Sequence, residues 1–490
     1  MIMKKQYISI ILVVITLSVF NSCDEDNIFY PKVKTANGVV TVNGIRAGGL
    51  EKAMIFNLGT VTKLIITDTI DSRDFRTMRD KMPKLAELDL TNATIAAYNG
   101  FEGTGGTNQY YYVANSIPEF AFYNSSTSSS KTSLTSIKLP SNIISIRNYA
   151  FLRCSGLSGN ITIPTSVTDT IGKSAFAFCT NISSITWSPV KFIDESAFQG
   201  CSGLTGTLMI PDSVLKISNS AFASCSKLSS ISIPSHVQEI GNFAFKDCGA
   251  LISVDSDNQN FLSIDGVLFT ADKSTLMQCP ISKTGSYEIP PEVLVIANSA
   301  FYNCAGLTSV QIPPSVFYID DGAFSGCSGL TGTFPISEAI FGIGTLVFEG
   351  CDKITNYVVN PNNTSFSSAD GVLVDIANTS VKRCVATKTG AYIIPTDITL
   401  IENGAFLGCN KLTSINIPAS VTTIGNRAFA NCTALIDIYS YATTPIDLTI
   451  VSTPFENINK NACTLHVPIG SKSKYRAAIG WNEFVKIVEI

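Results

Sequence analysis

The residues best suited to chemistry in this chain are its cysteines, and most of them recur in one short pattern. Fourteen cysteines occur in 490 residues. Ten of them follow a phenylalanine by three residues, nine within Ala-Phe-x-x-Cys and one within Val-Phe-x-x-Cys. These ten are Cys154, Cys179, Cys201, Cys225, Cys248, Cys304, Cys327, Cys351, Cys409 and Cys432. A thiol can act as a nucleophile, bind a metal or form a disulfide, and the spacing helps to decide among these.

The spacing favours a structural role for the cysteines. Successive copies lie 22 to 25 residues apart, except for two longer intervals of 56 and 58 residues. No Cys-x-x-Cys pair occurs, so the pattern of a zinc site is missing and we expect no metal. In a regular stack each thiol would have equal neighbours above and below, which gives no preferred disulfide partner. We therefore predict reduced cysteines that fill the interior as small apolar residues.

Other catalytic constellations are absent from the sequence. The chain has two histidines, His236 in a turn where other copies have serine and His466 in a strand-like segment near the C-terminus. Neither has a companion that spacing places nearby. No Gly-x-Ser-x-Gly elbow or phosphate-binding loop is present. The sequence predicts no catalytic residue and no cofactor, and it argues against an enzyme.

Two short strands precede each cysteine and must position it. The first is LxxIxIP, as in residues 228–234, and the second is VxxIGxxAF, as in residues 237–245. Alternating apolar residues indicate half-buried strands, and the proline ends the first one. A unit this small cannot bury its apolar side alone, whereas stacked units about 4.8 Å apart can. The pattern predicts a β-rich repeat solenoid over residues 115–442.

These residues resemble the BspA-type leucine-rich repeats, whose consensus LxxIxIPxxVxxIGxxAFxxC spans about 23 residues. The resemblance implies a right-handed leucine-rich repeat superhelix. It also implies an N-terminal α/β cap over residues 37–114, with a divergent repeat and a Tyr/Gly-rich insertion, and a small C-terminal cap over residues 443–490. Family members are associated with adhesion, which implies a host or matrix protein or a glycan as partner. The alternatives are a structural envelope protein without a dedicated ligand and an accessory to glycan capture or degradation.

The N-terminus reads as a targeting segment. Lys4 and Lys5 precede an apolar run of 13 residues, 8–20, which is too short to span a membrane and typical of a signal peptide, residues 1–22. The run ends in Phe-Asn-Ser-Cys23, which resembles a bacterial lipobox. Residues 23–36 would then form a lipidated acidic tether on the outer face of the outer membrane. A cleaved secretory peptide with an incidental cysteine is the alternative.

Composition and aromatic residues limit the kinds of partner that the sequence predicts. The net charge is −4, with 15% charged residues and no basic block, so nucleic acid is not expected. We expect a monomer that binds an extracellular protein or glycan. Aromatic side chains outside the core pattern are the candidate ligand-binding residues, because such rings stack on sugars and anchor protein interfaces. They are Tyr110, Tyr111 and Tyr112 in the insertion, which we expect the core not to need, and Trp187, Tyr318, Tyr357, Tyr439 and Tyr441 along the solenoid.

The lipid anchor gives the first testable prediction. Replacing Cys23 by alanine should move the protein from the detergent phase to the aqueous phase in a phase-partition assay, because several acyl chains hold a protein firmly in a membrane. A Cys23→Ala protein that stays in the detergent phase would show that the anchor is wrongly assigned.

Overall fold

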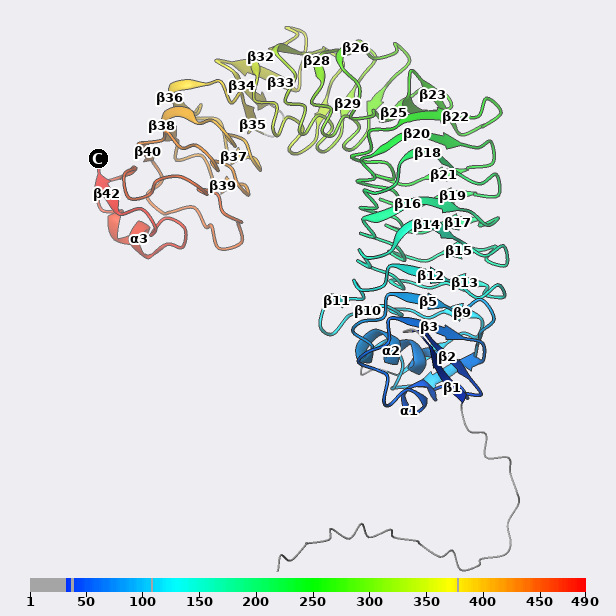
Figure 1. The fold of residues 1–490 in the computed structure, drawn as a ribbon. Coiled ribbons are helices and arrows are strands. Elements are labelled where there is room, and N and C mark those ends of the chain that lie inside the picture. Colours follow the sequence, from blue (N-terminus) through cyan, green and yellow to red (C-terminus); the bar gives the residue numbers. More distant parts are fainter. Residues whose placement is uncertain (1–31, 37–38, 107–108, 377–378) are drawn as a thin grey trace, which may run out of the picture.

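The chain folds as a solenoid of stacked coils, as the repeat predicts (Figure 1). The computed structural model describes residues 32–36, 39–106, 109–376 and 379–490. The expected signal peptide, Cys23 and most of the acidic tether lie outside these residues. Across the described residues, no helix is long and apolar enough to cross a membrane.

One strand of each coil comes from the LxxIxIP segment, and these strands form the long-strand row. Neighbours within each sheet of the row pair in parallel. The breaks between these sheets come before strands with a glycine bulge, such as Gly159 in β14 with φ of +74°. The strands are β2 (Val39–Asn43), β3 (Lys63–Ile66), β5 (Glu87–Asp89), β12 (Ser136–Lys138), β14 (Ser158–Thr162), β16 (Asn181–Thr186), β18 (Gly206–Met209), β20 (Leu228–Ile233), β22 (Leu251–Val254), β26 (Gly285–Glu288), β28 (Leu307–Gln311), β30 (Gly332–Ile336), β32 (Ile354–Val359), β36 (Thr389–Ile393), β38 (Lys411–Ile417), β40 (Asp437–Ser440), β41 (Thr464–Val467) and β42 (Lys486–Glu489).

The VxxIG segments form a second row, the short-strand row, on another side of each coil. Its strands also pair in parallel. They are β9 (Ser116–Ile117), β13 (Ser145–Ile146), β15 (Thr170–Ile171), β17 (Phe192–Ile193), β19 (Lys216–Ile217), β21 (Glu239–Ile240), β25 (Thr275–Gln278), β27 (Val295–Ile296), β29 (Tyr318–Ile319), β31 (Gly342–Ile343), β35 (Ser380–Cys384), β37 (Leu400–Ile401) and β39 (Thr423–Ile424).

Both ends of the stack are covered by other elements. At the N-terminus β1 (Lys32–Ala36) pairs antiparallel with β2, and the helices α1 (Leu50–Ala53) and α2 (Ser72–Lys81) pack beside the first coils with β4 (Thr69–Ile70) and β6 (Thr94–Ile95). At the C-terminus α3 (Lys472–Ala477) and the buried Trp481 close the core. The long-strand row continues through both regions, so the caps are extensions of the stack.

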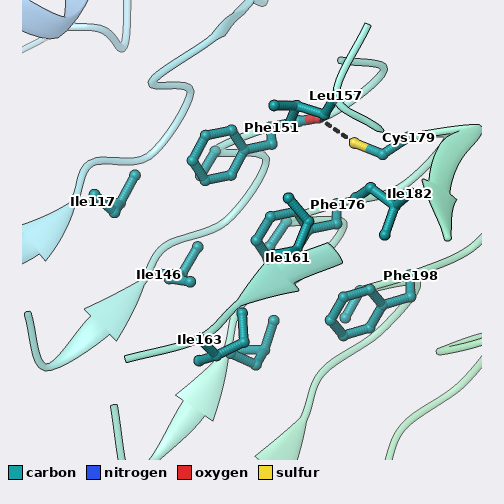
Figure 2. Packing of buried hydrophobic residues seen from close by; sticks show 14 of the residues in the cluster. Ile117, Ile146, Phe151, Leu157, Ile161, Ile163, Phe176, Cys179, Ile182 and Phe198 are labelled. Carbon is teal, nitrogen blue, oxygen red and sulfur yellow. Dashed lines mark hydrogen bonds between the residues drawn. The ribbon is translucent and has the colours of Figure 1, made fainter. Parts of the chain in front are cut away.

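The Ala-Phe turn forms a third ladder that joins the coils. The Phe222 N–H donates to the Ala244 carbonyl of the next coil at 2.8 Å, and Phe151, Phe176 and Phe198 make the same bond. The phenylalanine rings stack face to face, with centroids 5.0 Å apart for Phe151 and Phe176 (Figure 2). Because this spacing is close to the strand separation of about 4.8 Å, rings and backbone remain in register.

The cysteines pack into the interior of the stack. All thirteen described cysteines are free and buried. The thiol of Cys179 lies 3.1 Å from the carbonyl oxygen of Phe151 in the preceding coil (Figure 2). Burial raises the pKa of Cys201 to about 12, so its thiol stays protonated and unreactive at neutral pH. The same contact to the preceding phenylalanine is made by Cys154, Cys201, Cys225, Cys248, Cys327, Cys351 and Cys432.

Two unusual coils divide the solenoid into three segments. Each contains an extra hairpin, β23 (Phe261–Ile264) with β24 (Val267–Thr270) in residues 249–284, and β33 (Phe366–Ala369) with β34 (Val372–Asp375) in residues 352–388. We call these the first and second bend coils. The short-strand row is interrupted at both of them, and the buried apolar residues fall into three clusters that meet there. Figure 1 shows that the stack changes direction near each hairpin, so the whole molecule forms an arch.

A buried asparagine fixes the start of each hairpin. The Asn258 side-chain amide donates to the carbonyls of Pro234 and Val237 at 2.8 and 3.1 Å, and its oxygen accepts from the Phe261 N–H at 2.9 Å. Asn363 repeats this arrangement in the second bend coil. The two hairpins are therefore built in the same way.

The ring stack gives the second prediction. Phe222 is fully buried, and its ring stacks on those of Phe198 and Phe245 at 5.4 and 6.0 Å. Phe222→Ala should lower the free energy of unfolding by about 3–5 kcal/mol, measured by urea denaturation. Phe178, which is 40% exposed, is the control, and its replacement by alanine should cost about 0.5 kcal/mol or less. Equal costs for the two variants would contradict the role of the stack.

Candidate binding surface

The tyrosines of the insertion have different surroundings. Tyr110, Tyr111 and Tyr112 form β8 (Tyr110–Tyr112), which pairs antiparallel with β7 (Tyr98–Gly100). Tyr111 is 70% exposed, whereas Tyr112 is buried and its hydroxyl accepts a hydrogen bond from the Gly105 N–H at 2.6 Å. The expectation that Tyr112 is available to a ligand is therefore wrong, because a glycine-rich loop covers its ring.

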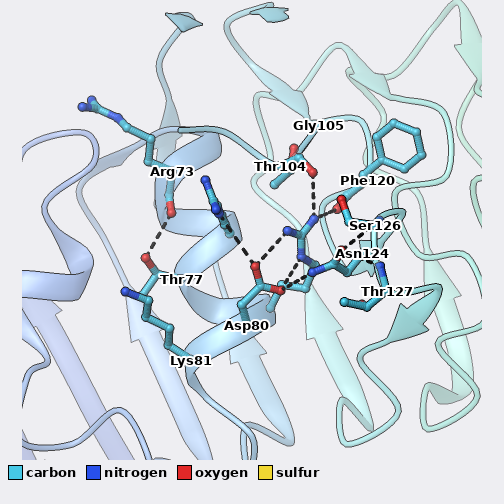
Figure 3. Close-up of polar contacts among 12 residues, drawn as sticks. Arg73, Thr77, Asp80, Lys81, Thr104, Gly105, Phe120, Asn124, Ser126 and Thr127 are labelled. Atoms are coloured by element: carbon cyan, nitrogen blue, oxygen red, sulfur yellow. Dashed lines mark hydrogen bonds and ion pairs between the residues drawn. The ribbon is translucent and has the colours of Figure 1, made fainter. Parts of the chain in front are cut away.

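A buried arginine ties the insertion to helix α2. Arg79 is 9% exposed and donates to the carbonyls of Thr104, Phe120 and Tyr123 at 2.9, 2.9 and 3.1 Å. Its other nitrogens pair with Asp80 at 2.7 and 2.9 Å. Figure 3 shows these partners converging at the end of α2. Through Thr104 the insertion supplies a buried contact of the N-terminal cap, and it remains a prediction that the core does not need the insertion.

The aromatic candidates of the solenoid are mostly part of its packing. Tyr357 is 2% exposed and packs against Phe348 at 5.1 Å, so the expectation that it faces solvent is wrong. Its strand reads Ile-x-x-Tyr-x-Val, which places Tyr357 at a core position of LxxIxIP. Trp187 occupies the next core position of its own strand and lies edge-on against Phe198 at 5.4 Å, half-buried.

Near the C-terminus, polar and aromatic candidates come together on the long-strand row. Neighbouring strands align Asn416, Tyr439 and His466 in one row. The Tyr439 and His466 rings stack at 4.2 Å, and His466 Nε2 lies 2.8 Å from an Asp437 carboxylate oxygen. Tyr441 is 44% exposed and its hydroxyl accepts from the Asn416 amide at 3.3 Å. Because His466 Nε2 faces Asp437 and its Nδ1 is buried, the hydrogen-bonding groups of this C-terminal cluster come from Asn416, Asp437 and Tyr441.

An exposed apolar column, which the aromatic search missed in part, lies in the middle segment. Leu294, Phe317 and Phe341 occupy equivalent positions in successive coils, joined by backbone hydrogen bonds of 3.0 Å. Leu294 is 39% and Phe341 62% exposed, and the rings of Phe317 and Phe341 stack at 5.4 Å. Tyr318 lies beside them, 6.3 Å from the Phe341 ring. We call these four residues the apolar column.

The side chain of Tyr318 depends on a neighbouring glycine. A Cβ on Gly342 would lie 2.3 Å from a carbon of the Tyr318 ring, so only glycine lets that ring rest on β31. The candidate Tyr318 is thus half-buried and belongs to the edge of the apolar column.

Only in the middle segment do successive coils carry apolar residues at this position. Before the first bend coil, Ile144 and Leu215 are separated by the exposed polar residues Asp169 and Lys191. After the second bend coil, Thr399 and Thr422 hold the position. Comparing one position across all repeats would have found this change in the sequence. Contiguous exposed apolar side chains of this kind mark interaction sites more often than scattered ones do.

Small-molecule chemistry has little support. A hollow of about 460 Å³ lies along β19 and β21, and two of its charged groups, Lys216 and Glu239, pair with each other at 2.6 Å. Within the ranges that the structure describes, no three His, Cys, Asp or Glu side chains are arranged to hold a metal ion. His466 and Asp437 form a pair without a nucleophile among their bonded partners. The surface is better suited to contacts with a large partner.

Comparison with known proteins agrees with the repeat. The family described as BspA type leucine rich repeat region matches residues 115–248, 193–288, 272–369 and 374–462, in six copies. None of the curated proteins matches the chain.

Three solved bacterial structures are similar to this chain over most of its length. A leucine-rich repeat protein from Eubacterium ventriosum is 20% identical with a TM-score of 0.48, covering 88% of this chain and 93% of that chain. A leucine rich cell surface protein from Faecalibacterium prausnitzii is 24% identical with a TM-score of 0.41, covering 86% and 95%. A leucine-rich repeat protein from Bacteroides ovatus is 17% identical with a TM-score of 0.37, covering 91% and 100%.

The arginine contact gives the third prediction. Arg79→Ala leaves three carbonyls without this partner and removes the nearest cation of Asp80, so it should lower the free energy of unfolding by about 3–5 kcal/mol and expose residues 98–124 to limited proteolysis. The matched control is Arg76, whose side chain is 45% exposed and lies 3.8 Å from Asp80. Arg76→Ala should cost about 1 kcal/mol or less. If both variants resist protease like the parent, the insertion is held by other contacts.

Proposed function

Because the chain belongs to the family of BspA-type leucine-rich repeat proteins, we propose that it is a surface recognition protein that binds another protein through its apolar column. The supporting observation is that Leu294, Phe317 and Phe341 hold three successive equivalent positions, with Leu294 and Phe341 exposed, whereas apolar residues at this position in the other segments are absent or separated by polar ones. An envelope protein without a ligand has no need for this local change.

The chemistry of the apolar column favours a protein partner over a glycan. The side chains of Phe317 and Phe341 have no polar atoms, and each ring covers one face of the other. Glycans are bound by open ring faces together with hydrogen-bonding groups, whereas buried aromatic anchors dominate protein interfaces. The C-terminal cluster around Tyr439 is the second candidate and would suit a glycan, since Asn416, Asp437 and Tyr441 supply polar groups there.

The proposal includes the location of the protein. Lipidation at Cys23 would anchor the chain in the outer membrane and hold the arch outside the cell, as the lipobox resemblance suggests. A tether of about a dozen residues would separate the membrane from the first coil. In this arrangement a monomer would meet extracellular proteins with the whole length of the arch.

A binding screen gives the fourth prediction. The chain without residues 1–22, applied to arrays of extracellular matrix proteins and of glycans, should bind at least one protein. A double variant, Phe317→Ser with Phe341→Ser, should bind that protein at least tenfold more weakly, a loss of about 1.4 kcal/mol or more. The matched control is Thr422→Ala, which changes the equivalent position in the third segment and should bind like the parent.

Other results would redirect the assignment. Unchanged affinity of the double variant would remove the apolar column as the site. Binding to glycans alone, lost in Tyr439→Ala, would favour the C-terminal cluster. Circular dichroism of each variant would show whether a loss of binding arises from unfolding.

A further inference from the structure

Each bend coil carries a cysteine where every other coil has a ring. The Cys279 N–H donates to the Ala300 carbonyl at 2.7 Å, and the Cys384 N–H donates to the Ala405 carbonyl at 2.6 Å. In ordinary coils this bond belongs to the phenylalanine of the Ala-Phe turn. Cys279 and Cys384 therefore interrupt the ring stack.

In both bend coils the sulfur of this extra cysteine converges with the sulfur of the following coil. The Sγ atoms of Cys279 and Cys304 lie 3.8 and 3.5 Å from the carbonyl oxygen of Pro280. In the second bend coil, the Sγ atoms of Cys384 and Cys409 both lie 3.5 Å from the carbonyl oxygen of Val385. The arrangement thus occurs twice, in coils built by the same rule.

Contact between the two thiols also affects their acidity. A hydrogen bond with Cys279, followed by burial, raises the pKa of Cys304 far above that of a free thiol. A hydrogen bond with Cys409 and burial do the same for the pKa of Cys384. The regular thiols Cys225 and Cys248 are also hydrogen-bonded to each other. Each of them, however, contacts the carbonyl of a different phenylalanine, whereas the two thiols of a bend coil share one carbonyl.

We propose that Cys279 with Cys304, and Cys384 with Cys409, are two latent disulfide sites that close when the protein meets a disulfide oxidant. The proposal does not depend on the binding function. One cysteine thiolate attacks a sulfur of the oxidant, for example oxidised glutathione, and displaces one glutathione thiolate. The second cysteine attacks the resulting mixed disulfide and displaces the other glutathione. Two protein thiols are oxidised to one disulfide, and one glutathione disulfide is reduced to two thiols.

The bend coils are also where an oxidant can enter. All four side chains are fully buried, so exchange requires local opening. Opening is easiest where cooperative contacts are interrupted. Both the short-strand row and the ring stack are interrupted at these coils, whereas the regular coils have both intact. Each bond would tie a bend coil to the next coil and fix the direction of the arch.

Disulfide mapping is the fifth prediction. The reduced full chain is incubated with oxidised glutathione in urea below its unfolding midpoint, free thiols are then alkylated in denaturant, and peptides are mapped by mass spectrometry without reduction. We expect links between Cys279 and Cys304 and between Cys384 and Cys409, with the regular cysteines Cys201 and Cys327 alkylated.

Matched variants test the assignment further. Cys304→Ala should abolish the first link and leave the second, and Cys201→Ala should leave both. Hydrogen exchange of residues 279–285 should slow on oxidation of the parent but not of Cys304→Ala. Links among regular cysteines, or the absence of both expected links after oxidation, would overturn the proposal.

Discussion

The separation of neighbouring strands, about 4.8 Å, is the constraint on which this structure depends. Any side chain that points inward must lie that far from its equivalent in the next coil. A flat ring stacked face to face meets this condition, and centroid spacings of 5.0 to 5.4 Å occur from Phe151 to Phe222. The adjoining cysteine is small enough to fit beneath the turn, where its thiol reaches the carbonyl of Phe151 or its equivalents. The constant separation of the coils thus requires the Ala-Phe-x-x-Cys pattern to recur in the sequence.

The two bend coils depart from this regular spacing, and both do so with the same set of residues. The side chain of an asparagine such as Asn258 forms hydrogen bonds to backbone carbonyls of the preceding coil. A cysteine stands at the position that a phenylalanine holds in ordinary coils. Direct contacts then join the coils on either side, for example the hydrogen bond of 2.8 Å between Asn303 and Asp247 and the ion pair of 2.9 Å between Arg427 and Glu349. The core is divided at these coils without being opened.

Much of the fold could be predicted from the sequence because one period controls it. The two strands, the buried phenylalanines and the buried cysteines all follow from repetition. The burial of Tyr357 could also have been predicted from the sequence, because Tyr357 stands at an isoleucine position of the repeat.

Features that do not repeat were harder to predict. The Arg79 contacts join residues far apart in sequence, and no local pattern marks them. The apolar column is invisible within one repeat and appears only when the same position is compared between segments. Contacts such as those of Arg79 depend on geometry between distant segments and required the structure, whereas the apolar column could have been found by comparing one position across the repeats.

The segmentation of the core has a consequence for how such a protein can change its dimensions. Within a segment, a coil contacts only its two neighbours, so one coil can be gained or lost at a local cost. Each such event would lengthen or shorten one arm of the arch by about 4.8 Å. The direction in which the next arm leaves would stay as the bend coil sets it. The distance between the two ends of the arch can therefore change in evolution through the number of coils in each arm, while the bend coils stay the same.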